Sequence, residues 1–478
     1  MRKNDFIEGT IEELRYPNKG IFWVEQDGSS PIEVIVKNAL PGQTVLVRIT
    51  KKRAARAEAV LYKVLAPAPC EKKPSCAEFG SCGGCLFLSF PKEVERELKE
   101  NEIRHLLQTV DPHVDSWFEG ILDSPISEEY RNKMELSFGD QEKGGDLVLG
   151  MHKRGSFYDI ADASSCQIVD SDCRTIIQKT GDFFAKEQVP FFHRKEKKGY
   201  LRHLLIREGK KTGEILVDVV TTNQTQTLSN GVVEEKLLKE YVQMLQGLSL
   251  KGKIVGILHT HNDSVADLVK DGGTDLLYGK GSYEEELLGL HFTVTPFSFF
   301  QTNSVGAELL YQTARGWITS DHMDLVSQNN RKPVIFDLYC GTGTISLLMA
   351  PTASKVVGVE IVPEAVQAAK ENAVRNNITN CEFIEGDVLK VLDTLKEKPD
   401  LIILDPPRDG VHPKALPKIL AYGVPSILYI SCKPTSLVRD FPVIKDAGYH
   451  PVRGVAINQF PRTTQTEVAV MFHREKGE

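Results

Sequence analysis

Short apolar runs alternate with helical stretches over the C-terminal part of the chain, and this alternation constrains the fold more than any other feature. The runs have the length and the β-branched content of strands, and a helical pattern at 363–376 follows the second of them. They lie at 334–338, 355–360, 381–384, 401–404 and 427–431. Such alternation predicts a doubly wound α/β sheet, whose ligands bind beyond the carboxyl ends of its strands. We therefore expect an α/β domain over residues 294–478, with functional residues directly after its strands.

Residues 1–65 predict a separate small domain. They consist of β-rich segments punctuated by turns such as Asp27-Gly28 and Pro41-Gly42, which is typical of a small closed or nearly closed β-barrel of the OB type. Barrels of this kind often carry an oligonucleotide on one face. A barrel that only docks on the rest of the protein is the alternative.

Residues 66–293 predict a central domain. A proline-rich linker and a helix at 91–110 come first, and strand patterns then alternate with turns, including a hairpin tip at 207–214. We expect a mixed α+β domain dominated by antiparallel sheet. A length of 478 residues suits about two to four domains.

The composition is that of a soluble globular protein, with 41% hydrophobic residues and a net charge of −7. The charge excludes a globally basic nucleic-acid binder but not a local basic footprint. Residues 1–20 are polar and no run approaches the length of a membrane span, so we expect a cytoplasmic protein. We also expect a monomer.

Three further patterns have two interpretations each. The basic runs 51–56 and 194–198 are more often solvated loops than phosphate contacts. His259 and His261 alternate along an expected strand and would face the same side, which fits ordinary packing and also a two-histidine metal site.

A glycine turn follows the first strand of the C-terminal domain. Gly341 and Gly343 let the chain reverse close to a ligand, because no side chain blocks the backbone there. Glu360 ends the next strand, where a carboxylate can hold two ribose hydroxyls, and Asp387 follows the third, where it can accept from an adenine amine. The turn and two carboxylates, in step with successive strands, predict an S-adenosylmethionine site rather than a dinucleotide site.

Two motifs follow the fourth and fifth strands and are expected at the same edge of the sheet. The first is Asp405-Pro406-Pro407-Arg408, a pattern that can hold an exocyclic amine for N-methylation. The second contains Cys432, and a thiol points to a different acceptor. Uracil C5 is too weak a nucleophile to take a methyl group unaided, whereas a thiolate added at C6 turns C5 into an enolate-like carbon. We expect Lys433 to favour the thiolate, and we interpret Cys340 as packing against the donor.

Carbon methylation also needs a base for the C5 proton. Glu467 lies beside an apolar strand near the end of the chain, although position alone does not separate it from a surface glutamate. The early cysteines Cys76, Cys82 and Cys85 have a Cys-x5-Cys-x2-Cys spacing. That spacing suits thiolate ligation of an iron–sulfur cluster or of zinc and does not by itself separate the two.

The chain resembles the S-adenosylmethionine-dependent RNA uracil-5-methyltransferases over essentially its whole length. The motifs that carry the resemblance are the early cysteines, Tyr130-Arg131-Asn132-Lys133, Phe300-Gln301-Thr302-Asn303 with the glycine turn, and the Asp405 and Cys432 motifs. The resemblance implies methylation of uridine at C5, with Cys432 as nucleophile and Glu467 as base. It implies donor contacts from Gln301, Tyr339, Gly341, Thr344, Glu360, Asp387 and Asp405.

The resemblance also implies a TRAM-type barrel that binds RNA, and a four-iron four-sulfur cluster. The implied cluster ligands are Cys76, Cys82, Cys85 and Cys166. Cys70 is an additional cysteine that could compete with Cys166 as the fourth ligand. Members with both barrel and cluster act mainly on large-subunit ribosomal RNA, so 23S ribosomal RNA is the expected substrate and transfer RNA the alternative.

One stretch departs from the family pattern. Residues 458–461 read Asn-Gln-Phe-Pro where the family usually has Asp-Met-Phe-Pro, and Gln465 replaces a histidine. Two other functions stay open: an amine methyltransferase that uses Asp405, for which Cys432 would have no use, and a non-catalytic RNA-binding factor, against which the intact Cys432, Glu467 and donor turn argue.

Overall fold

The computed structural model describes residues 1–26, 29–228, 231–266, 269, 272–319, 331–395 and 397–475. The predicted turn at Asp27-Gly28 lies outside them. The chain forms two compact units: the first contains residues 1–74, 86–123 and 403–478, and the second contains residues 75–85 and 124–402. The division into three domains (1–65, 66–293 and 294–478) stays a prediction. Within the described residues, the helices are too short or too polar to span a bilayer.

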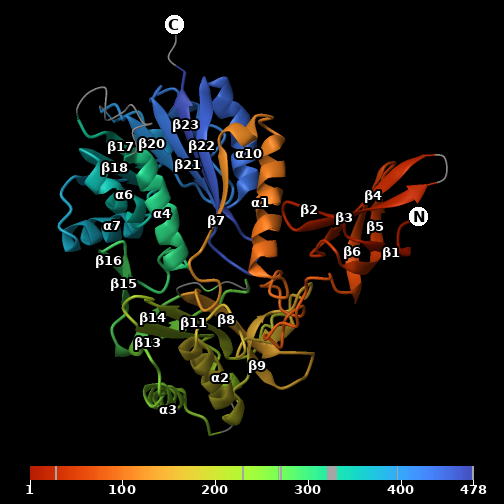
Figure 1. The fold of residues 1–478 in the computed structure, drawn as a ribbon. Helices are drawn as coiled ribbons and strands as arrows, with labels where there is room; N and C mark the ends of the chain where they lie inside the picture. Colours follow the sequence, from red (N-terminus) through yellow and green to blue (C-terminus); the bar gives the residue numbers. More distant parts are fainter. Residues whose placement is uncertain are drawn as a thin grey trace. The chain divides into compact units, whose positions relative to one another are not determined.

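The first unit begins with a six-stranded sheet (Figure 1). Its strands are β1 (Phe6–Thr10), β2 (Glu13–Arg15), β3 (Lys19–Gln26), β4 (Ser29–Lys37), β5 (Thr44–Lys52) and β6 (Arg56–Ala66). The order is β1-β5-β6-β4-β3-β2, with β4 and β6 parallel and the other neighbours antiparallel. Apolar side chains on alternate positions of β4 and β5 point into one core, which also contains Phe22 of β3.

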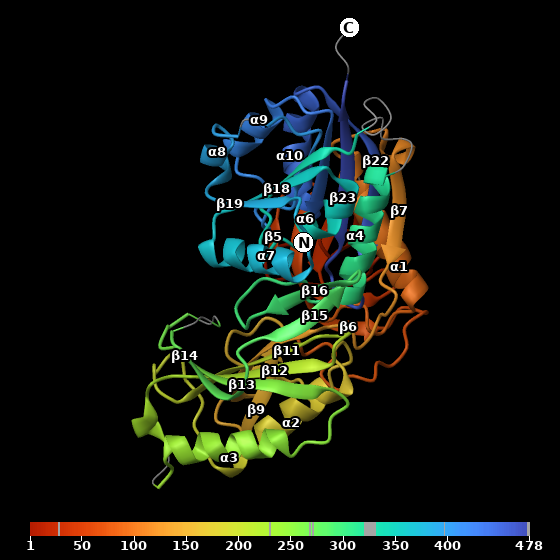
Figure 2. The same ribbon diagram turned by 90° about the vertical axis from the view of Figure 1, so that its left-hand side faces the viewer.

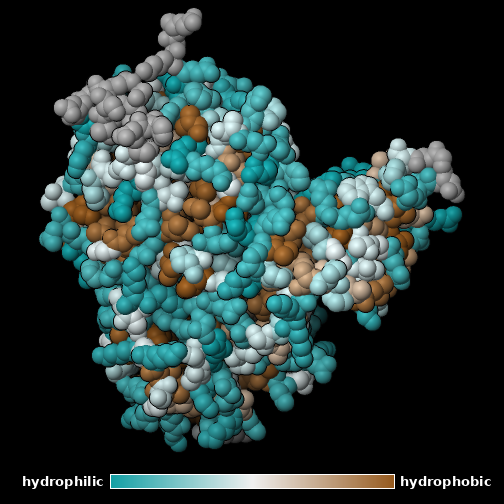
Figure 3. Space-filling view, viewed as in Figure 1, coloured by the Kyte–Doolittle hydropathy of each residue, from teal (hydrophilic) through white to brown (hydrophobic). Residues whose placement is uncertain are grey.

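The described strands of this sheet have an order with two ends, β1 and β2, so they do not form a closed barrel; of the predicted closed or nearly closed barrel, the nearly closed form stays a prediction. The reason lies at β2, which has three residues and pairs with β3 alone. Outside the core, β6 exposes Val60 and Tyr62, and the Tyr62 ring packs edge-on against Phe6 at 5.1 Å between centroids. Figure 3 shows hydrophobic and hydrophilic side chains interleaved on the visible face of this sheet.

The remainder of the first unit is an α/β layer. It contains α1 (Lys92–Gln108), β7 (Phe118–Asp123), the last two residues of β20 (Leu401–Leu404), α9 (Ala415–Leu420), β21 (Ser426–Ser431), α10 (Pro434–Asp446), β22 (Tyr449–Asn458) and β23 (Glu467–Arg474). The strand order is β20-β21-β23-β22-β7. Helices α1 and α10 lie side by side (Figure 1). Residues 467–472 of β23 are buried without alternation, as expected of a strand covered on both faces.

The second unit contains a seven-stranded sheet and the helices that cover it. Its elements are β8 (Lys133–Asp140), β9 (Leu147–His152), β10 (Ile160–Asp162), α2 (Ser171–Lys186), β11 (Leu201–Glu208), β12 (Glu214–Thr221), α3 (Glu234–Gln246), β13 (Lys253–His261) and β14 (Thr274–Gly279). The order is β10-β9-β8-β11-β12-β13-β14, and β12–β13 is the parallel pair among these antiparallel strands. Helices α2 and α3 contact each other on one face of the sheet (Figure 2). The mainly antiparallel central fold is confirmed, as is the hairpin tip between β11 and β12.

The second unit also holds a hairpin and the first part of the α/β alternation. It comprises the hairpin β15 (Tyr283–Leu287) and β16 (Leu290–Val294), then α4 (Ser304–Thr319), β17 (Val334–Leu338), α6 (Thr344–Met349), β18 (Lys355–Glu360), α7 (Pro363–Arg375), β19 (Cys381–Glu385) and α8 (Val388–Val391). The order β19-β18-β17 is parallel throughout. Asp400 donates its backbone N–H to the carbonyl of Val334 at 2.8 Å, so the segment entering β20 begins beside β17. The alternation predicted from the apolar runs is confirmed.

Candidate active site

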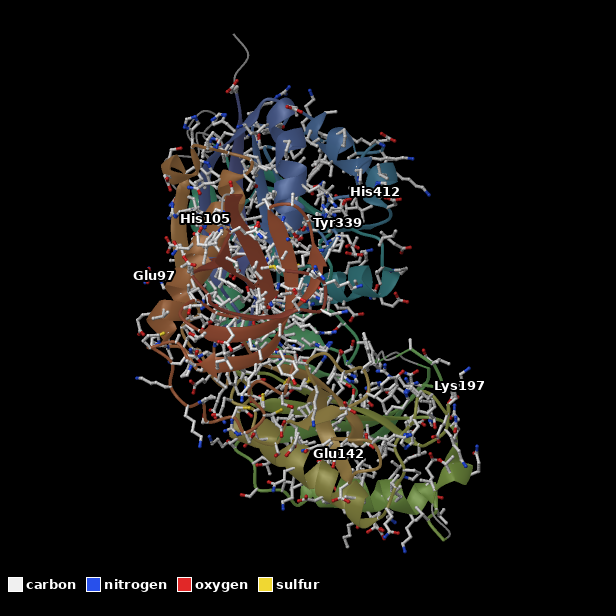
Figure 4. The ribbon with its side chains drawn as sticks, turned by 90° about the vertical axis from the view of Figure 1, so that its right-hand side faces the viewer. Glu97, His105, Glu142, Lys197, Tyr339 and His412 are labelled. Carbon is white, nitrogen blue, oxygen red and sulfur yellow. The ribbon has the colours of Figure 1, made fainter. Side chains whose placement is uncertain are left out.

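The predicted donor turn joins β17 to α6 in the second unit. Gly341 and Gly343 have positive φ angles of 54° and 78°. A Cβ at Gly343 would lie 2.9 Å from the Phe383 ring, so only glycine fits there, whereas a Cβ at Gly341 would meet nothing within 4 Å. Tyr339, labelled in Figure 4, is also in the left-handed region, at φ 73°. The turn therefore leaves open space at Gly341 and holds a side chain in an uncommon conformation, which is frequent at ligand sites.

Glu360 braces this turn. One of its carboxylate oxygens accepts the N–H of Gly341 at 3.0 Å, and the other accepts those of Ile361 and Val362 at 2.8 and 3.0 Å. A carboxylate offers about four lone-pair positions, so Glu360 retains capacity for a hydroxyl. Asp387 begins α8 and accepts the N–H of Leu389 at 2.9 Å. Both carboxylates follow strands adjacent in the sheet, as the sequence predicted.

Two of the motifs that carry the family resemblance meet in the second unit. Asn132 donates its side-chain amide to the carbonyl of Gln301 at 3.1 Å and to the hydroxyl of Ser304 at 2.7 Å. The backbone N–H of Asn132 also reaches the carbonyl of Thr302 at 3.0 Å. The Tyr130–Lys133 motif therefore fixes the segment containing Gln301 immediately before α4.

The predicted acceptor residues come together in the first unit. Cys432 directly follows β21 and Glu467 begins β23, and the register pairs Ser431 with Val468. These two strands are antiparallel neighbours, so the end of one and the start of the other share an edge of the sheet. Glu467 is 4% exposed and Cys432 is half-buried. Asp405, predicted as a donor contact, is close enough for its charge to act on both.

Burial and charged neighbours determine the pKa values of Cys432 and Glu467. Burial, followed by the charges of Glu467 and Asp405, raises the pKa of the Cys432 thiol to about 11, and Arg408 opposes the shift. Burial, followed by the charge of Asp405, raises the pKa of Glu467 to about 8. The free protein thus holds a protonated thiol at neutral pH. Burial and the nearby carboxylates dominate the pKa of the Cys432 thiol, and the expectation that Lys433 favours the thiolate stays a prediction.

Tyr16 is a residue of the acceptor region that sequence reasoning missed. It lies in the turn between β2 and β3, half-buried. Burial and the charges of Glu102, Glu467 and Cys432 raise the pKa of its phenol, so all three groups lie within electrostatic reach. The same turn is anchored on α1, where the N–H of Asn18 donates to Glu102 at 2.9 Å. The N-terminal sheet therefore contributes a side chain beside the predicted nucleophile and base.

A buried ionic cluster supports the segment before Glu467. The Lys99 ammonium of α1 contacts Glu95 at 2.8 Å and the side-chain oxygen of Asn458 at 2.7 Å. Arg462 contacts the second oxygen of Glu95 at 3.1 Å. The Lys99 and Glu95 side chains are only 1% and 2% exposed. Asn458 is one of the departures from the family pattern, and its amide oxygen accepts from the Lys99 ammonium.

The early cysteines lie in the second unit together with Cys166. Burial, followed by the charges of Cys76 and Cys82, raises the pKa of the Cys166 thiol, and Arg154 donates to the carbonyl of Cys85 at 2.9 Å. Cys70 instead packs in the first unit against an apolar cluster that contains Leu14 and Phe87.

Ligand atoms that surround a single ion lie close together. Among the described residues, a group of three has its ligand atoms within 4.8 Å of one another: His259, His261 and Asp275. This group contains no cysteine. The iron–sulfur cluster on Cys76, Cys82, Cys85 and Cys166 therefore stays a prediction.

The two histidines of β13 face one side of the sheet, as predicted, and each has a protein partner. His259 Nε2 lies 2.8 Å from the Thr221 hydroxyl, and His261 Nε2 lies 3.0 Å from an oxygen of Asp275. Burial and the neighbouring His261 lower the pKa of His259 to about 4. These pairings account for both side chains as packing residues.

Comparisons with known proteins give the family. A family model described as a methyltransferase domain matches residues 329–439. An uncharacterized RNA methyltransferase of Clostridium tetani is 44% identical over 99% of each chain. The chain belongs to a family of RNA methyltransferases. A second relative, an uncharacterized RNA methyltransferase of Clostridium acetobutylicum, is 41% identical, again over 99% of each chain.

A solved structure similar to this RNA methyltransferase gives the fold. It is the Pyrococcus abyssi tRNA (uracil-54, C5)-methyltransferase in complex with S-adenosyl-L-homocysteine. That protein is 23% identical, covers 98% of this chain and 100% of its own, and has a TM-score of 0.72. The likeness confirms the class I methyltransferase fold predicted from the alternation of strands and helices.

Proposed function

We propose that the protein methylates C5 of a uridine in RNA with S-adenosylmethionine as the donor. The observation that carries this proposal is the pair Cys432 and Glu467, of which the first directly follows β21 and the second begins its antiparallel neighbour β23. A thiol beside a buried carboxylate is what a carbon acceptor needs and what an amine acceptor does not. The glycine turn, Glu360 and Asp387 support the donor, because they offer backbone space and two carboxylates at successive strand ends.

The proposed reaction begins at C6 of uracil. Cys432 loses its proton to water, and its sulfur bonds to C6 while the C5–C6 double bond supplies the electron pair that attacks the donor methyl group. A bond from C5 to the methyl carbon forms as the bond from that carbon to the donor sulfur breaks, releasing S-adenosylhomocysteine. Glu467 then takes the C5 proton, the double bond re-forms, and Cys432 leaves as a thiolate.

The protonation of the pair fits these steps. A carboxylate with a pKa of about 8 binds a proton much more strongly than an ordinary glutamate, so its ionised fraction, which grows as the pH rises towards 8, is a stronger base for the proton on carbon. Arg408 is the neighbour whose charge lowers the pKa of Cys432 and therefore supports the thiolate. Removing water when RNA binds strengthens that interaction, because electrostatic attraction increases in a low dielectric.

We further propose 23S ribosomal RNA as the substrate and a four-iron four-sulfur cluster on Cys76, Cys82, Cys85 and Cys166. The six-stranded N-terminal sheet and the grouping of Cys166 with the other cysteines support these assignments. Transfer RNA is the second candidate, because the similar Pyrococcus abyssi protein acts on transfer RNA. The cluster would supply a structural crosslink to the loop that holds its ligands.

The deciding experiment compares products and adducts. Purified protein is incubated with deuterated S-adenosylmethionine and with unmodified transcripts of 23S ribosomal RNA or transfer RNA, and nucleosides are identified by mass spectrometry. We expect 5-methyluridine. Cys432→Ala should give neither product nor covalent complex, whereas Glu467→Gln should stall as a protein–RNA band on a denaturing gel. Cys381→Ala is the matched control and should behave as wild type.

RNA that carries 5-fluorouridine at the target should trap the wild-type protein, because fluorine cannot leave as a cation. Near-normal turnover by Cys432→Ala would refute the uracil-C5 mechanism. Amine methylation through the Asp405 motif would then take its place, and the labelled nucleoside would carry its methyl group on nitrogen.

A further inference from the structure

A small pocket in the second unit combines aromatic and basic side chains outside the residues discussed above. It is lined by residues of β8, β9, β10 and β11 of the seven-stranded sheet and has a volume of about 80 Å³. We call it the aromatic–basic pocket, and its relevant residues are His152, Phe157, Tyr158, Phe192, Arg194 and Arg202. A cavity of this size takes only part of a nucleotide, so the rest of such a ligand would lie on the rim.

The rim presents exposed rings. Phe157 and Tyr158 are 77% and 52% exposed, which leaves large apolar faces in water. The Lys195 ammonium lies over the Tyr158 ring, 4.6 Å from its centroid, and the Arg202 guanidinium lies 4.9 Å from that of Phe192. Exposed rings interleaved with cations are the composition of surfaces on which bases of single-stranded nucleic acid stack.

The pocket is electropositive. Burial and the charge of Arg194 lower the pKa of Arg202, and burial with both guanidinium charges lowers the pKa of His203 to about 3. Arg202 is fixed by backbone carbonyls, including that of Asn262 at 2.8 Å, so its position does not depend on a carboxylate. Asp140, the acidic residue of the lining, accepts the N–H of Gly144 at 2.7 Å.

The basic run 194–198 belongs to this surface. Arg194 lines the pocket, and Lys195, Lys197 and Lys198 are exposed beside it. Figure 4 shows Lys197 at the outer margin of the second unit. The cations of the run therefore belong to the same surface as the exposed rings and do not form an isolated basic loop.

The cysteine loop braces the segment that carries the rim. The N–H of Gly83 donates to the carbonyl of His152 at 3.2 Å, and that of Arg154 donates to the carbonyl of Ser81 at 2.7 Å. Cys82 forms an isolated antiparallel bridge with Lys153. The segment that runs on to Phe157 and Tyr158 is thus held at its start by the loop containing Cys82 and Cys85.

We propose that the aromatic–basic pocket binds one nucleotide of the single-stranded part of the RNA substrate. The base stacks on Tyr158, and Arg194 and Lys195 contact the phosphate. This inference rests on RNA being the substrate under the proposed function. It also assigns a purpose to the cysteine loop, which holds the RNA-binding rim in place.

The test uses the full-length protein and two fluorescein-labelled RNA dodecamers, one of uridines and one abasic with the same backbone. Anisotropy titrations give the affinities. We expect Tyr158→Ala to weaken uridine-dodecamer binding roughly 5- to 150-fold, the range for loss of one base–aromatic stack, and to leave abasic binding unchanged. Arg194→Gln should weaken both and reduce the slope of log affinity against log salt by about 0.7.

Two control variants and one separate assay make the outcome decisive. Tyr278→Ala removes an exposed ring of β14, and Lys186→Gln removes an exposed cation of α2; both should bind as wild type. If Tyr158→Ala binds both dodecamers as the Tyr278→Ala protein does, the pocket is not a base-stacking site. An equal loss for uridine and abasic RNA would also refute stacking.

Methylation is measured in parallel. Absence of 5-methyluridine with binding that still depends on Tyr158 would refute the proposed reaction and leave the pocket standing. Formation of 5-methyluridine with binding independent of Tyr158 would refute only the pocket. Thermal unfolding of each variant checks that an exposed-site substitution has not disturbed the fold.

Discussion

Removal of a charged neighbour should shift the pKa of Cys432, and the direction of the shift should depend on the sign of the charge that is removed. Its pKa is raised from an ordinary 9.0 to about 11, with burial as the first cause and the charges of Glu467 and Asp405 as the next. Glu467→Gln can remove only the part of this shift that its charge contributes, so the change must be smaller than about 2 pH units. We expect about 1 unit, which equals about 1.4 kcal/mol and a roughly tenfold gain in thiolate at pH 9.

The assay is alkylation of Cys432 by iodoacetamide between pH 6 and 10, followed by mass spectrometry of the peptide that contains it. Only the thiolate reacts, so the rate reports the fraction ionised. Wild type and Glu467→Gln should coincide below about pH 7, because Glu467 is then protonated in the wild type, and should diverge above about pH 8, the value to which its pKa is raised. Asp405→Asn should shift the profile in the same direction, and Arg408→Gln in the opposite one.

The reasoning would be refuted if Glu467→Gln left the profile unchanged at pH 9 or moved it to higher pH. In either case the Glu467 charge would not reach the Cys432 sulfur, and the proposed pairing of nucleophile and base would lose its physical basis. Cys432→Ala supplies the background for the peptide. No RNA is needed, so the result does not depend on knowing the target uridine.

Three other changes give separate expectations. Cys166→Ser should lower the iron content of protein purified without oxygen. Cys70→Ser should leave it unchanged, because Cys70 packs in an apolar cluster. Metal analysis measures the iron, and the reverse pattern would make Cys70 the fourth ligand in place of Cys166. Tyr16→Ala should slow adduct formation on 5-fluorouridine RNA even at saturating RNA. If the substitution changed only the RNA affinity, the N-terminal sheet would bind RNA without acting on the reaction. Lys99→Ala should reduce the free energy of unfolding by about 3–5 kcal/mol, because it breaks a buried ion pair. Urea titration measures it, and the exposed Lys236→Ala should cost no more than about 1 kcal/mol.

Sequence predicted the α/β region accurately because its signals are local. The strands at 334–338 and 355–360 and the helix from Pro363 have the bounds that the apolar runs and the proline indicate, to within a residue. The positions of Glu360 and Cys432 follow from the same rule, since the carboxyl ends of parallel strands share one edge of a sheet. The glycine turn could be predicted as well. The positive φ of Gly343 and the nearby Phe383 ring leave no room for a side chain, so the sequence carries a glycine at this position.

Features that depend on distant residues could not be predicted in this way. Helix α1 was expected over 91–110, but nothing in its pattern shows that Glu95 and Lys99 point inward, because charged residues are usually on the solvent side. Their burial depends on partners from the C-terminal part of the chain, Asn458 and Arg462. The end of the N-terminal sheet at β2 could not be read from the sequence for the same reason, since strand pairing is not a local property.

The N-terminal sheet and the acceptor residues share a unit, and physical contacts explain why. Glu102 of α1 receives the Asn18 N–H from the β2–β3 turn, and Lys99, one turn earlier on the helix, holds Asn458 at the end of β22. The strand register places Ile457 opposite Glu467. Helix α1 thus links the turn of Tyr16 to the proposed base through two buried polar contacts. A substitution in α1 should therefore disturb both the N-terminal turn and Glu467, although no residue of α1 takes part in the proposed chemistry.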